Sequence, residues 1–594
     1  MKQTTKLQEP AATTKQEQAV QVVKQTFTGG EILLKTLQEL AKKHPGIRRI
    51  AGHHGGAILP FYEYYTKSEL YKGYIHAPNE QIAGFIAKGY ANTNNEVGVS
   101  IATSGPGATN LLTPLYDCFM DSTPVVFITA NVPTTVSGSM AFQEAPITHM
   151  ASTVTKKTYY VTQVEYLQET LHEAFNIARK GRPGPVLIDI PKDVLLAETT
   201  HKQVSIQEKT ISLPIDVSTI REVISKAKKP LIYAGGGIKM ADASTLLREF
   251  ANKYEIPVTT TLKAKGVYPE THPLALRMLG MHGTAYANYA VHEADLLLVL
   301  GARFDDRVTA NPDEFAKQAY IIHIDIDPKG IGKNRQPHIT LQANVKEALK
   351  ELLKEDIQTQ DYTQWHKRIQ ELKQTYPLDY DRDKTLKAQQ AIDILWAITK
   401  GEHAIIADVG QHQMWAAQHY ATAIPNGFDT SAGSGTMGCS LAQGIGTYYA
   451  RREAGEQTPV TVICGDESFL MNPQTLKLYA QEQLDILVLI IDNKEEDGTP
   501  GGMVKQWYTD VHNNTQQPVK GKTDIVAISE GFGVPAVETN NAEELIRHIE
   551  EAVSVKGPRL INIRVNPNEK CLPILPPGKT INEMRTYQDI SSGR

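Results

Sequence analysis

Residues 460–468 have the sequence Val460-Thr-Val-Ile-Cys-Gly-Asp-Glu-Ser468, in which an apolar run of strand length passes directly into glycine and polar side chains. Two other runs follow the same plan. Ala404-Ile-Ile-Ala407 passes into Asp408-Val-Gly-Gln-His412, and residues 486–491 pass into Asp492-Asn493. A continuous apolar run is typical of a strand that helices cover on both faces, and hence of a parallel sheet. Ligands of open parallel sheets bind beyond the carboxyl ends of the strands, so the three runs predict one ligand-binding edge.

The residues that follow these runs indicate what the edge could bind. Oxygen donors such as those of Asp466 and Asn493 suit Mg²⁺, which takes few protein ligands together with phosphate oxygens. Glycines at Gly410 and Gly465 let backbone N–H groups approach a diphosphate. The alternative is ordinary turn chemistry, because Gly-Asp and Asp-Asn are common after strands. That alternative is favoured for any one of the three runs, whereas the three together favour a binding site.

Similar apolar runs recur along the chain and alternate with helical patterns. They lie at residues 124–129, 186–190, 231–233, 296–300 and 320–325. The alternation predicts an α/β protein built from open parallel-sheet domains.

Composition shifts divide the chain into three blocks. A polar stretch at 197–214 indicates a linker between the first and the central block. A charged, helical stretch at 346–389 contains no strand-like run and separates the central block from the third. We predict a flexible N-terminal tail, a first block, a central block, a third block and a Pro-rich C-terminal tail that lies over a neighbouring domain, at residues 1–26, 27–196, 197–385, 386–570 and 571–594.

The overall composition excludes several classes of protein. The chain has 594 residues, with 61 Lys and Arg against 66 Asp and Glu, for a net charge of −5. This balance gives no basic excess for nucleic acid or for an anionic membrane surface. Since no run approaches the roughly 18 apolar residues that a membrane-spanning helix needs, we expect neither nucleic acid nor a membrane as a partner.

Cysteine usage and the N-terminus indicate the location. Cys118, Cys439, Cys464 and Cys571 are scattered with no CxxC pair, which indicates buried thiols in a reducing compartment. Residues 1–25 lack the apolar segment of a secretory signal. We therefore expect a cytoplasmic protein. The alternative is an organellar leader, because this stretch carries lysines and few acids.

The first block adds two candidate features and one that we set aside. Residues 104–110 (Ser-Gly-Pro-Gly-Ala-Thr-Asn) follow an apolar stretch and open a helix, which predicts a turn that faces an anion or cofactor. Glu80 starts a helical stretch, where a carboxylate alone most often complements the helix dipole. His53 and His54 lack further ligands at metal-binding spacing, so we interpret them as loop residues.

Residues 433–438 fit the pattern GxGxxG but carry little weight. No strand-like run precedes them, and no acidic residue lies at the required distance after a following strand. A dinucleotide fingerprint needs that context.

Seven segments together resemble the FAD-containing acetohydroxyacid synthases (acetolactate synthases), a family of thiamine-diphosphate enzymes. The resemblance runs from about Phe27 to Met584, and its segments are 101–110, 142–145, 181–193, 280–284, 303–307, 408–415 and 503–507. It implies a pyrimidine-binding domain, a central FAD-binding domain and a diphosphate-binding domain, in that order.

The resemblance also implies roles for individual residues. Glu80 matches the glutamate that activates the cofactor, and Gln143 lies near the thiazolium ring. Lys192, Arg307 and Trp507 match residues around the substrate channel. The implied metal ligands are Asp466, Asn493 and the main-chain carbonyl of Glu495. The implied thiamine-diphosphate contacts are Gly410, Gln411, His412, Gly435, Met437, Ser468 and Met503. The implied FAD contacts are Arg182, Gly235, Gly236, Gly237, Thr261, Leu262, Gly280, His282, Gly283, Arg303 and Asp325.

The activity that the resemblance implies is carboligation in branched-chain amino-acid biosynthesis. The thiamine-diphosphate ylid attacks pyruvate, CO₂ leaves, and the hydroxyethyl unit adds to pyruvate or 2-oxobutyrate, giving 2-acetolactate or 2-aceto-2-hydroxybutyrate. The family further implies Mg²⁺, an FAD without a redox role, a homodimer or homotetramer, and a separate small regulatory subunit.

Two alternatives stay open. One is another flavin- and thiamine-diphosphate-dependent 2-oxo-acid enzyme such as a pyruvate oxidase, against which Arg303-Phe-Asp-Asp-Arg307 argues. The other is a cofactor-poor, non-catalytic homologue that acts in binding or assembly. Retention of Glu80, Gln143, Asp466 and Asn493 argues against the second alternative.

The departures from the family pattern lie close to the chemistry. Glu467 replaces a small residue after the metal-binding aspartate, where a carboxylate would repel a diphosphate. Residues 494–501 form a longer and more acidic loop. His76-Ala-Pro-Asn79 before Glu80, His53-His54 and Lys263 also differ from the usual residues. These positions put the affinity for thiamine diphosphate and Mg²⁺ at issue.

Overall fold

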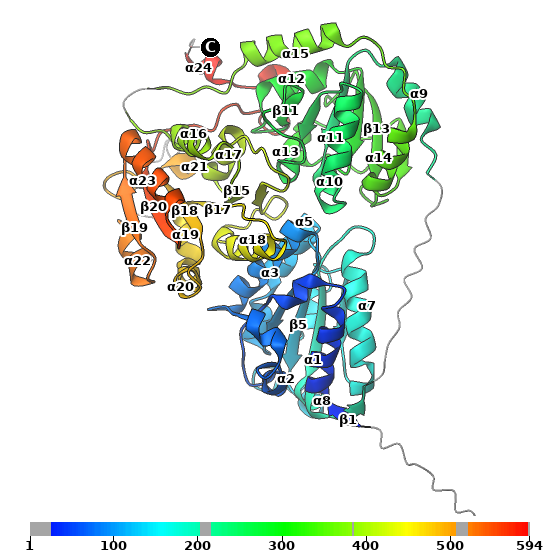
Figure 1. Ribbon diagram of the computed structural model, residues 1–594, viewed down its shortest axis with the longest axis vertical. Coiled ribbons are helices and arrows are strands. Elements are labelled where there is room, and N and C mark those ends of the chain that lie inside the picture. Colours follow the sequence, from blue (N-terminus) through cyan, green and yellow to red (C-terminus); the bar gives the residue numbers. More distant parts are fainter. Residues whose placement is uncertain (1–24, 202–214, 383–384, 500, 506–520, 592–594) are drawn as a thin grey trace, which may run out of the picture.

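The computed structural model describes residues 25–201, 215–382, 385–499, 501–505 and 521–591. They form three six-stranded parallel sheets and one two-stranded antiparallel pair (Figure 1). Each parallel sheet lies within one of the three blocks, with helices packed against it. This confirms the α/β class and the open parallel sheets that the sequence predicts.

The first block has the strand order β3-β2-β4-β5-β7-β6. Its strands are β2 (Ile50–Gly52), β3 (Ile75–His76), β4 (Gly98–Ala102), β5 (Val125–Asn131), β6 (Lys157–Tyr160) and β7 (Val186–Pro191). Its helices are α1 (Gly29–Leu40), α2 (Leu59–Tyr65), α3 (Glu80–Asn94), α4 (Pro106–Thr109), α5 (Leu112–Asp121), α6 (Ile147–Ala151), α7 (Leu167–Arg179) and α8 (Lys192–Leu196).

The central block has the order β11-β10-β9-β12-β13-β14. Its strands are β9 (Pro230–Ala234), β10 (Val258–Thr260), β11 (Ala275–Met278), β12 (Leu296–Leu300), β13 (Tyr320–Asp325) and β14 (Ile339–Gln342). Its helices are α9 (Ser218–Lys226), α10 (Gly236–Met240), α11 (Ser244–Lys253), α12 (Ala285–Glu293), α13 (Asp306–Thr309), α14 (Val345–Lys354) and α15 (Thr363–Thr375).

The third block has the order β16-β15-β17-β18-β20-β19. Its strands are β15 (Ala404–Ala407), β16 (Phe428–Thr430), β17 (Val460–Gly465), β18 (Ile486–Asp492), β19 (Ala536–Thr539) and β20 (Arg559–Arg564). Its helices are α16 (Ala388–Thr399), α17 (Gln411–His419), α18 (Ser440–Glu453), α19 (Asp466–Met471), α20 (Leu476–Gln481), α21 (Gly502–Lys505), α22 (Ile525–Gly531) and α23 (Ala542–Ser554); α24 (Tyr587–Ser591) lies in the C-terminal tail.

All eight apolar runs singled out in the sequence are strands of these sheets, and most of their side chains are fully buried. Short strands were missed. β16 has three residues and precedes residues 433–438, so the statement that no strand comes before that GxGxxG match is wrong. Three residues at a sheet edge are too few to produce a recognisable apolar run.

The two ends of the first block pair with each other, and the C-terminal tail packs on the central block. β1 (Thr26–Thr28) pairs antiparallel with β8 (Glu198–Thr200), which lies in the stretch predicted as a linker. The C-terminal tail lies over the central block, as the sequence predicts. Leu575 N donates to Met281 O over 2.7 Å, and the side chains of Leu575 and Met584 belong to one small apolar cluster. Predicted tail residues 1–24 and linker residues 202–214 lie outside the described residues, and among those described no helix is long and apolar enough to cross a membrane.

A buried carboxyl group in the first sheet leads to a pH-dependent stability prediction. Asp189 on β7 accepts hydrogen bonds of 2.7 Å from Thr129 Oγ1 and from Asn131 Nδ2. Burial raises the pKa of Asp189 to about 6, and the two hydrogen bonds oppose this rise. The cost of ionising Asp189 therefore lowers the free energy of unfolding progressively as the pH rises from about 4 to 6. Above pH 6 this loss of stability has reached its full size and stays constant.

We expect Asp189→Asn to raise the free energy of unfolding by up to roughly 3 kcal/mol at pH 8, and by about half of that at pH 5. The melting temperature should rise accordingly at both pH values. The asparagine carries no charge; its Oδ1 can accept from Asn131 Nδ2 while its Nδ2 donates to Thr129 Oγ1, so the hydrogen bond to Thr129 is reversed. Melting curves at both pH values, with exposed Asp313→Asn as the control, test this expectation. A melting temperature that falls at pH 8, or a difference that does not vary with pH, would contradict it.

Candidate active site

The three predicted strand ends meet at one edge of the third sheet, because β15, β17 and β18 are direct neighbours. Asp408, after β15, accepts backbone hydrogen bonds of 2.9 Å from Gly438 and Ser440. It therefore fixes the loop that carries Gly435 and Met437 against the start of α18. Met437 is half-buried and Gly435 is exposed.

The turn between β15 and α17 has the features of a diphosphate-binding corner. The His412 ring lies so close to Gly410 and Gly465 that a Cβ atom on either glycine would approach it to 2.7 Å. Burial lowers the pKa of His412 to about 4, so the ring is neutral at pH 7. Its buried Nε2 has no hydrogen-bond partner within the described part of the chain. An unpaired polar atom beside an α-helix N-terminus fits a diphosphate group.

Gln411 and Asn493 lie together beside this corner. Asn493 Nδ2 donates to Gln411 Oε1 over 3.2 Å, and a Cβ on Gly502 would lie 2.1 Å from that oxygen. Ser468 Oγ donates to the carbonyl of Val409 at 3.2 Å, which joins α19 to the same turn. The structure thus brings Gly410, Gln411, His412, Ser468 and Asn493 together.

Asp466 carries a partner that the sequence reasoning missed. Lys494 Nζ lies 3.0 Å from Asp466 Oδ2 and 2.8 Å from Glu467 Oε1. Burial and then the charge of Asp492 raise the pKa of Asp466 to about 6, while Lys494 opposes this rise. The extra carboxylate Glu467 is thereby paired with an ammonium group. The missed signal is the lysine that directly follows Asn493.

The carbonyl of Glu495 is also occupied within the protein. It accepts a 2.9 Å hydrogen bond from Gly498 N and a 3.4 Å contact from Arg564 Nη2, which also donates to the Lys494 carbonyl at 3.0 Å. The site contains the types of oxygen ligand that Mg²⁺ prefers, namely a carboxylate, an amide and a main-chain carbonyl. In this arrangement, however, one is already bound to a cation and another to N–H groups, so the residues do not fit Mg²⁺ as they lie.

Glu80 lies at the start of α3, where Asn79 caps the helix by accepting a hydrogen bond from Ile82 N at 2.9 Å. The Glu80 side chain is buried, with 6% of the residue exposed. Asn110 Nδ2 donates to Glu80 Oε2 over 2.8 Å. Asn110 ends the segment 104–110, which forms a turn and the short helix α4 as the sequence predicts. Asn110 itself was missed as a partner of Glu80.

Gln143 lies against the same turn. Its φ of 63° is left-handed, and a Cβ on Gly105 would lie 2.9 Å from its Cα atom. Its neighbours Met140 and Phe142 are 94% and 88% exposed. Glu80 and Gln143 therefore both pack on residues 104–110, and the loop of Gln143 presents apolar side chains to its surroundings.

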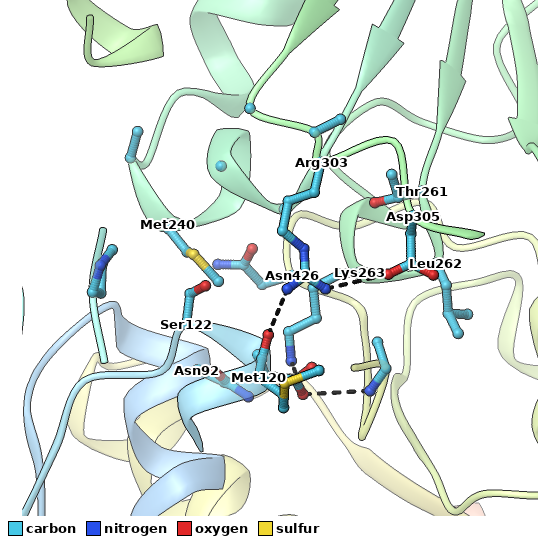
Figure 2. Close-up of a pocket in the computed structure, with 18 of the residues that line it drawn as sticks. Asn92, Met120, Ser122, Met240, Thr261, Leu262, Lys263, Arg303, Asp305 and Asn426 are labelled. Carbon is cyan, nitrogen blue, oxygen red and sulfur yellow. Dashed lines mark hydrogen bonds and ion pairs between the residues drawn. The ribbon is translucent and has the colours of Figure 1, made fainter. Parts of the chain in front are cut away.

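A cavity of about 1390 Å³ connects the three blocks. Figure 2 shows Arg303 extending across it: Nη1 donates to the Met120 carbonyl at 3.0 Å, and Nη2 lies 3.5 Å from Asp305 Oδ2. Arg182 enters from the first block and is held by Ser122 Oγ at 2.7 Å. The predicted site residues that line the cavity are Arg182, Gly236, Gly237, Thr261, Leu262, His282, Arg303, Arg307, Asp325, Gly410, Gly435 and Met503.

This cavity fits a large dinucleotide cofactor with anionic phosphates, because it is large, partly apolar and lined by several arginines. The other predicted flavin positions do not line it. Gly235, Gly280 and Gly283 instead pack against the backbones of Gly301, Arg307 and Leu279.

A cluster of buried charges, which we call the lysine–aspartate cluster, borders the cavity, because two of its members, Asp121 and Lys263, line the cavity wall. It joins residues from all three blocks: Lys88, Asp117, Asp121, Lys239, Lys263 and Asp429. Lys263, a departure from the family pattern, contacts Asp429 Oδ1 at 2.9 Å and Asp121 Oδ2 at 3.1 Å. Burial alone would lower the pKa of Lys263, but these aspartates raise it overall, so the ammonium stays charged.

Lys192 lies elsewhere, at a second pocket of about 790 Å³ beside His54 and His76. The rings of His53 and His54 stack on His76, with centroids 5.0 and 4.5 Å away. Within the described ranges, no group of three His, Cys, Asp or Glu side chains could hold a metal ion. Predicted residue Trp507 lies outside the described residues.

Family models match most of the chain. They describe the N-terminal TPP-binding domain, the central domain and the C-terminal TPP-binding domain of thiamine pyrophosphate enzymes, at residues 27–152, 217–352 and 408–563.

Curated relatives match over nearly the full length. The "Acetolactate synthase large subunit" of Cyanidium caldarium is 41% identical over 93% of this chain and 97% of its own length. "Acetolactate synthase 1, chloroplastic" of Zea mays is 39% identical over 94% of this chain and 88% of its own. The "Acetolactate synthase isozyme 1 large subunit" of Escherichia coli K12 is 38% identical over 94% and 97%.

Proposed function

Because the chain belongs to the acetolactate synthase family of thiamine pyrophosphate enzymes, we propose that it decarboxylates pyruvate and joins the remaining two-carbon unit to a second 2-oxo acid. With pyruvate as acceptor the product is 2-acetolactate, and with 2-oxobutyrate it is 2-aceto-2-hydroxybutyrate. The observation that carries the proposal is the corner of Gly410, Gln411 and His412, with its unpaired Nε2, at the ends of neighbouring strands.

Thiamine diphosphate, when bound, supplies a nucleophilic carbon and an electron sink for decarboxylation. The backbone at Gly410 and Gln411, together with His412, would hold its diphosphate. Glu80 is buried and oriented through Asn110, so its carboxylate is placed to accept or share a proton with a cofactor ring. Arg307 on the cavity wall and Lys192 at the second pocket would attract the carboxylates of 2-oxo acids.

FAD is the group that we propose for the cavity between the blocks. Arg182 and Arg303 would bind its phosphates, and Gly236 and Gly237 would let the backbone approach it. Carboligation has no net oxidation, so the flavin needs no redox role. Mg²⁺ would bind at Asp466 and Asn493 only if Lys494 gave up its contact with Asp466.

The assembly and location follow as further proposals. Two of the three relatives named above carry the words "large subunit" in their names, which supports a separate small regulatory subunit for this chain. The exposed Met140 and Phe142 beside Gln143 support a homodimer or homotetramer that covers this loop. We propose a cytoplasmic location; the chloroplastic relative leaves a plastid as the alternative.

The purified full chain, with thiamine diphosphate, Mg²⁺ and FAD, is expected to consume two pyruvate molecules for each CO₂ released and to form 2-acetolactate without oxygen uptake. Product can be measured as acetoin after acid decarboxylation, alongside CO₂ release and an oxygen electrode. Oxygen uptake equal to CO₂ release would instead identify an oxidase. Folded protein with no turnover would identify the non-catalytic homologue.

A further inference from the structure

Lys494 is held in place from both ends. Its backbone N–H donates to Asp492 Oδ1 at 3.1 Å, and its carbonyl accepts from Arg564 Nη2 at 3.0 Å. The residue is 8% exposed, and its ammonium bridges Asp466 and Glu467. Lys494 is therefore fixed through its backbone as well as through its ammonium group, and it is an integral part of the site.

The Lys494 ammonium contacts the Asp466 carboxylate, whose oxygens a divalent cation would use as ligands. Asp466 Oδ2 contacts Lys494 Nζ at 3.0 Å. A divalent cation on the same carboxylate would lie close to the ammonium, and like charges at such distances repel strongly away from bulk water. The cation and the ammonium therefore compete for Asp466.

Glu467 offers the ammonium a second position. Its side chain is 46% exposed, whereas that of Asp466 is 10% exposed, so the Lys494–Glu467 pair can persist at the solvent side when Asp466 is taken by another cation. This gives the two unusual residues one shared role, because Glu467 would otherwise leave an unpaired carboxylate beside the diphosphate corner.

We propose that Lys494 is an internal competitor for the divalent cation at Asp466, and that Glu467 receives the ammonium when the cation binds. The choice of cation rests on the proposed function. The consequence is a divalent-cation affinity that is lower than Asp466 and Asn493 alone would give. Glu467 partly restores this affinity by drawing Lys494 away.

Mn²⁺ binding to the purified full chain, followed by the electron paramagnetic resonance signal of free Mn²⁺, tests the proposal without turnover. Lys494→Gln and Lys494→Met are expected to tighten Mn²⁺ binding at least about tenfold. Lys556→Gln is the control, because Lys556 is exposed and precedes β20, at the edge of the third sheet opposite to Asp466 and Asn493. It should change the Mn²⁺ affinity less than about twofold.

Glu467→Gln is expected to weaken Mn²⁺ binding, and to do so more in the parent chain than in the Lys494→Gln background. Removal of a nearby negative charge alone would weaken binding equally in both backgrounds. Unchanged Mn²⁺ affinity in both Lys494 variants, or equal effects of Glu467→Gln in both backgrounds, would overturn the proposal. Neither result depends on acetolactate formation, so failure here and failure of the proposed function are separate outcomes.

Discussion

Replacing Glu80 by glutamine is expected to lower the rate of acetolactate formation at least about 100-fold, within the range that a positioned acid–base group contributes. The side chain is buried and its Oε2 is held by Asn110, so glutamine keeps the shape and loses the carboxyl group that can take up and release a proton. Binding of thiamine diphosphate, followed by tryptophan fluorescence or circular dichroism, should stay within a few-fold of the parent chain.

Glu169→Gln is the matched control for this variant. Glu169 lies on α7, is exposed and lines neither of the two pockets described above, so its loss should change the rate less than about twofold. If Glu80→Gln kept more than a tenth of the parent rate, the acid–base role of Glu80 would be wrong. If it lost cofactor binding in proportion to rate, the residue would be a binding residue instead.

Replacing Lys88 by methionine is expected to destabilise the protein by about 3–5 kcal/mol, because it leaves a buried carboxylate without its cation. Lys88 on α3 is fully buried and bridges Asp117 and Asp121, the latter at 2.8 Å. Burial lowers the pKa of Lys88, but the two aspartates raise it well above its usual value overall, so the lysine is charged in the folded state. Lys88 contacts Asp117 through Oδ1, and Asp117 Oδ2 has no hydrogen-bond partner within the described residues.

Thermal and urea unfolding of the apo-protein, reported as the first transition, would measure this loss. Lys72→Met breaks an exposed pair with Glu69 and should cost less than about 1 kcal/mol. Asp117→Asn added to Lys88→Met should recover part of the stability, since it removes the unpaired charge. A Lys88→Met variant as stable as the Lys72→Met control would show that the cluster contributes little.

The strands that the sequence predicted were those with long, continuous apolar runs. β12 (Leu296–Leu300) and β18 lie inside their sheets and are buried on both faces. Because such positions favour apolar side chains throughout, both strands could be recognised from the sequence. β3 and β16 have two and three residues and could not be seen in this way. The pairing of β1 with β8 joins segments about 170 residues apart, which no local pattern encodes.

The candidate site was predictable where it depends on strand ends. Asp466 and Asn493 follow β17 and β18, and parallel neighbours necessarily deliver their last residues to one edge. The partners of those residues were not predictable, because Lys494 reaches Asp466 and Asn110 reaches Glu80 through side-chain conformations that tertiary packing selects. The same holds for Lys263, whose buried charge makes sense only beside Asp121 and Asp429 from two other blocks.

The antiparallel pairing of β1 and β8 places the entry and exit of the first block side by side. Thr26 faces Thr200 and Thr28 faces Glu198, so the two ends are separated by little more than one strand spacing, about 5 Å. A segment whose ends meet can be joined by a short connector, circularly permuted or moved into another chain without stretching its backbone. The first block could therefore be exchanged between related enzymes at one place on the backbone, provided that the residues it contributes to the cavity and to the lysine–aspartate cluster match the other two blocks.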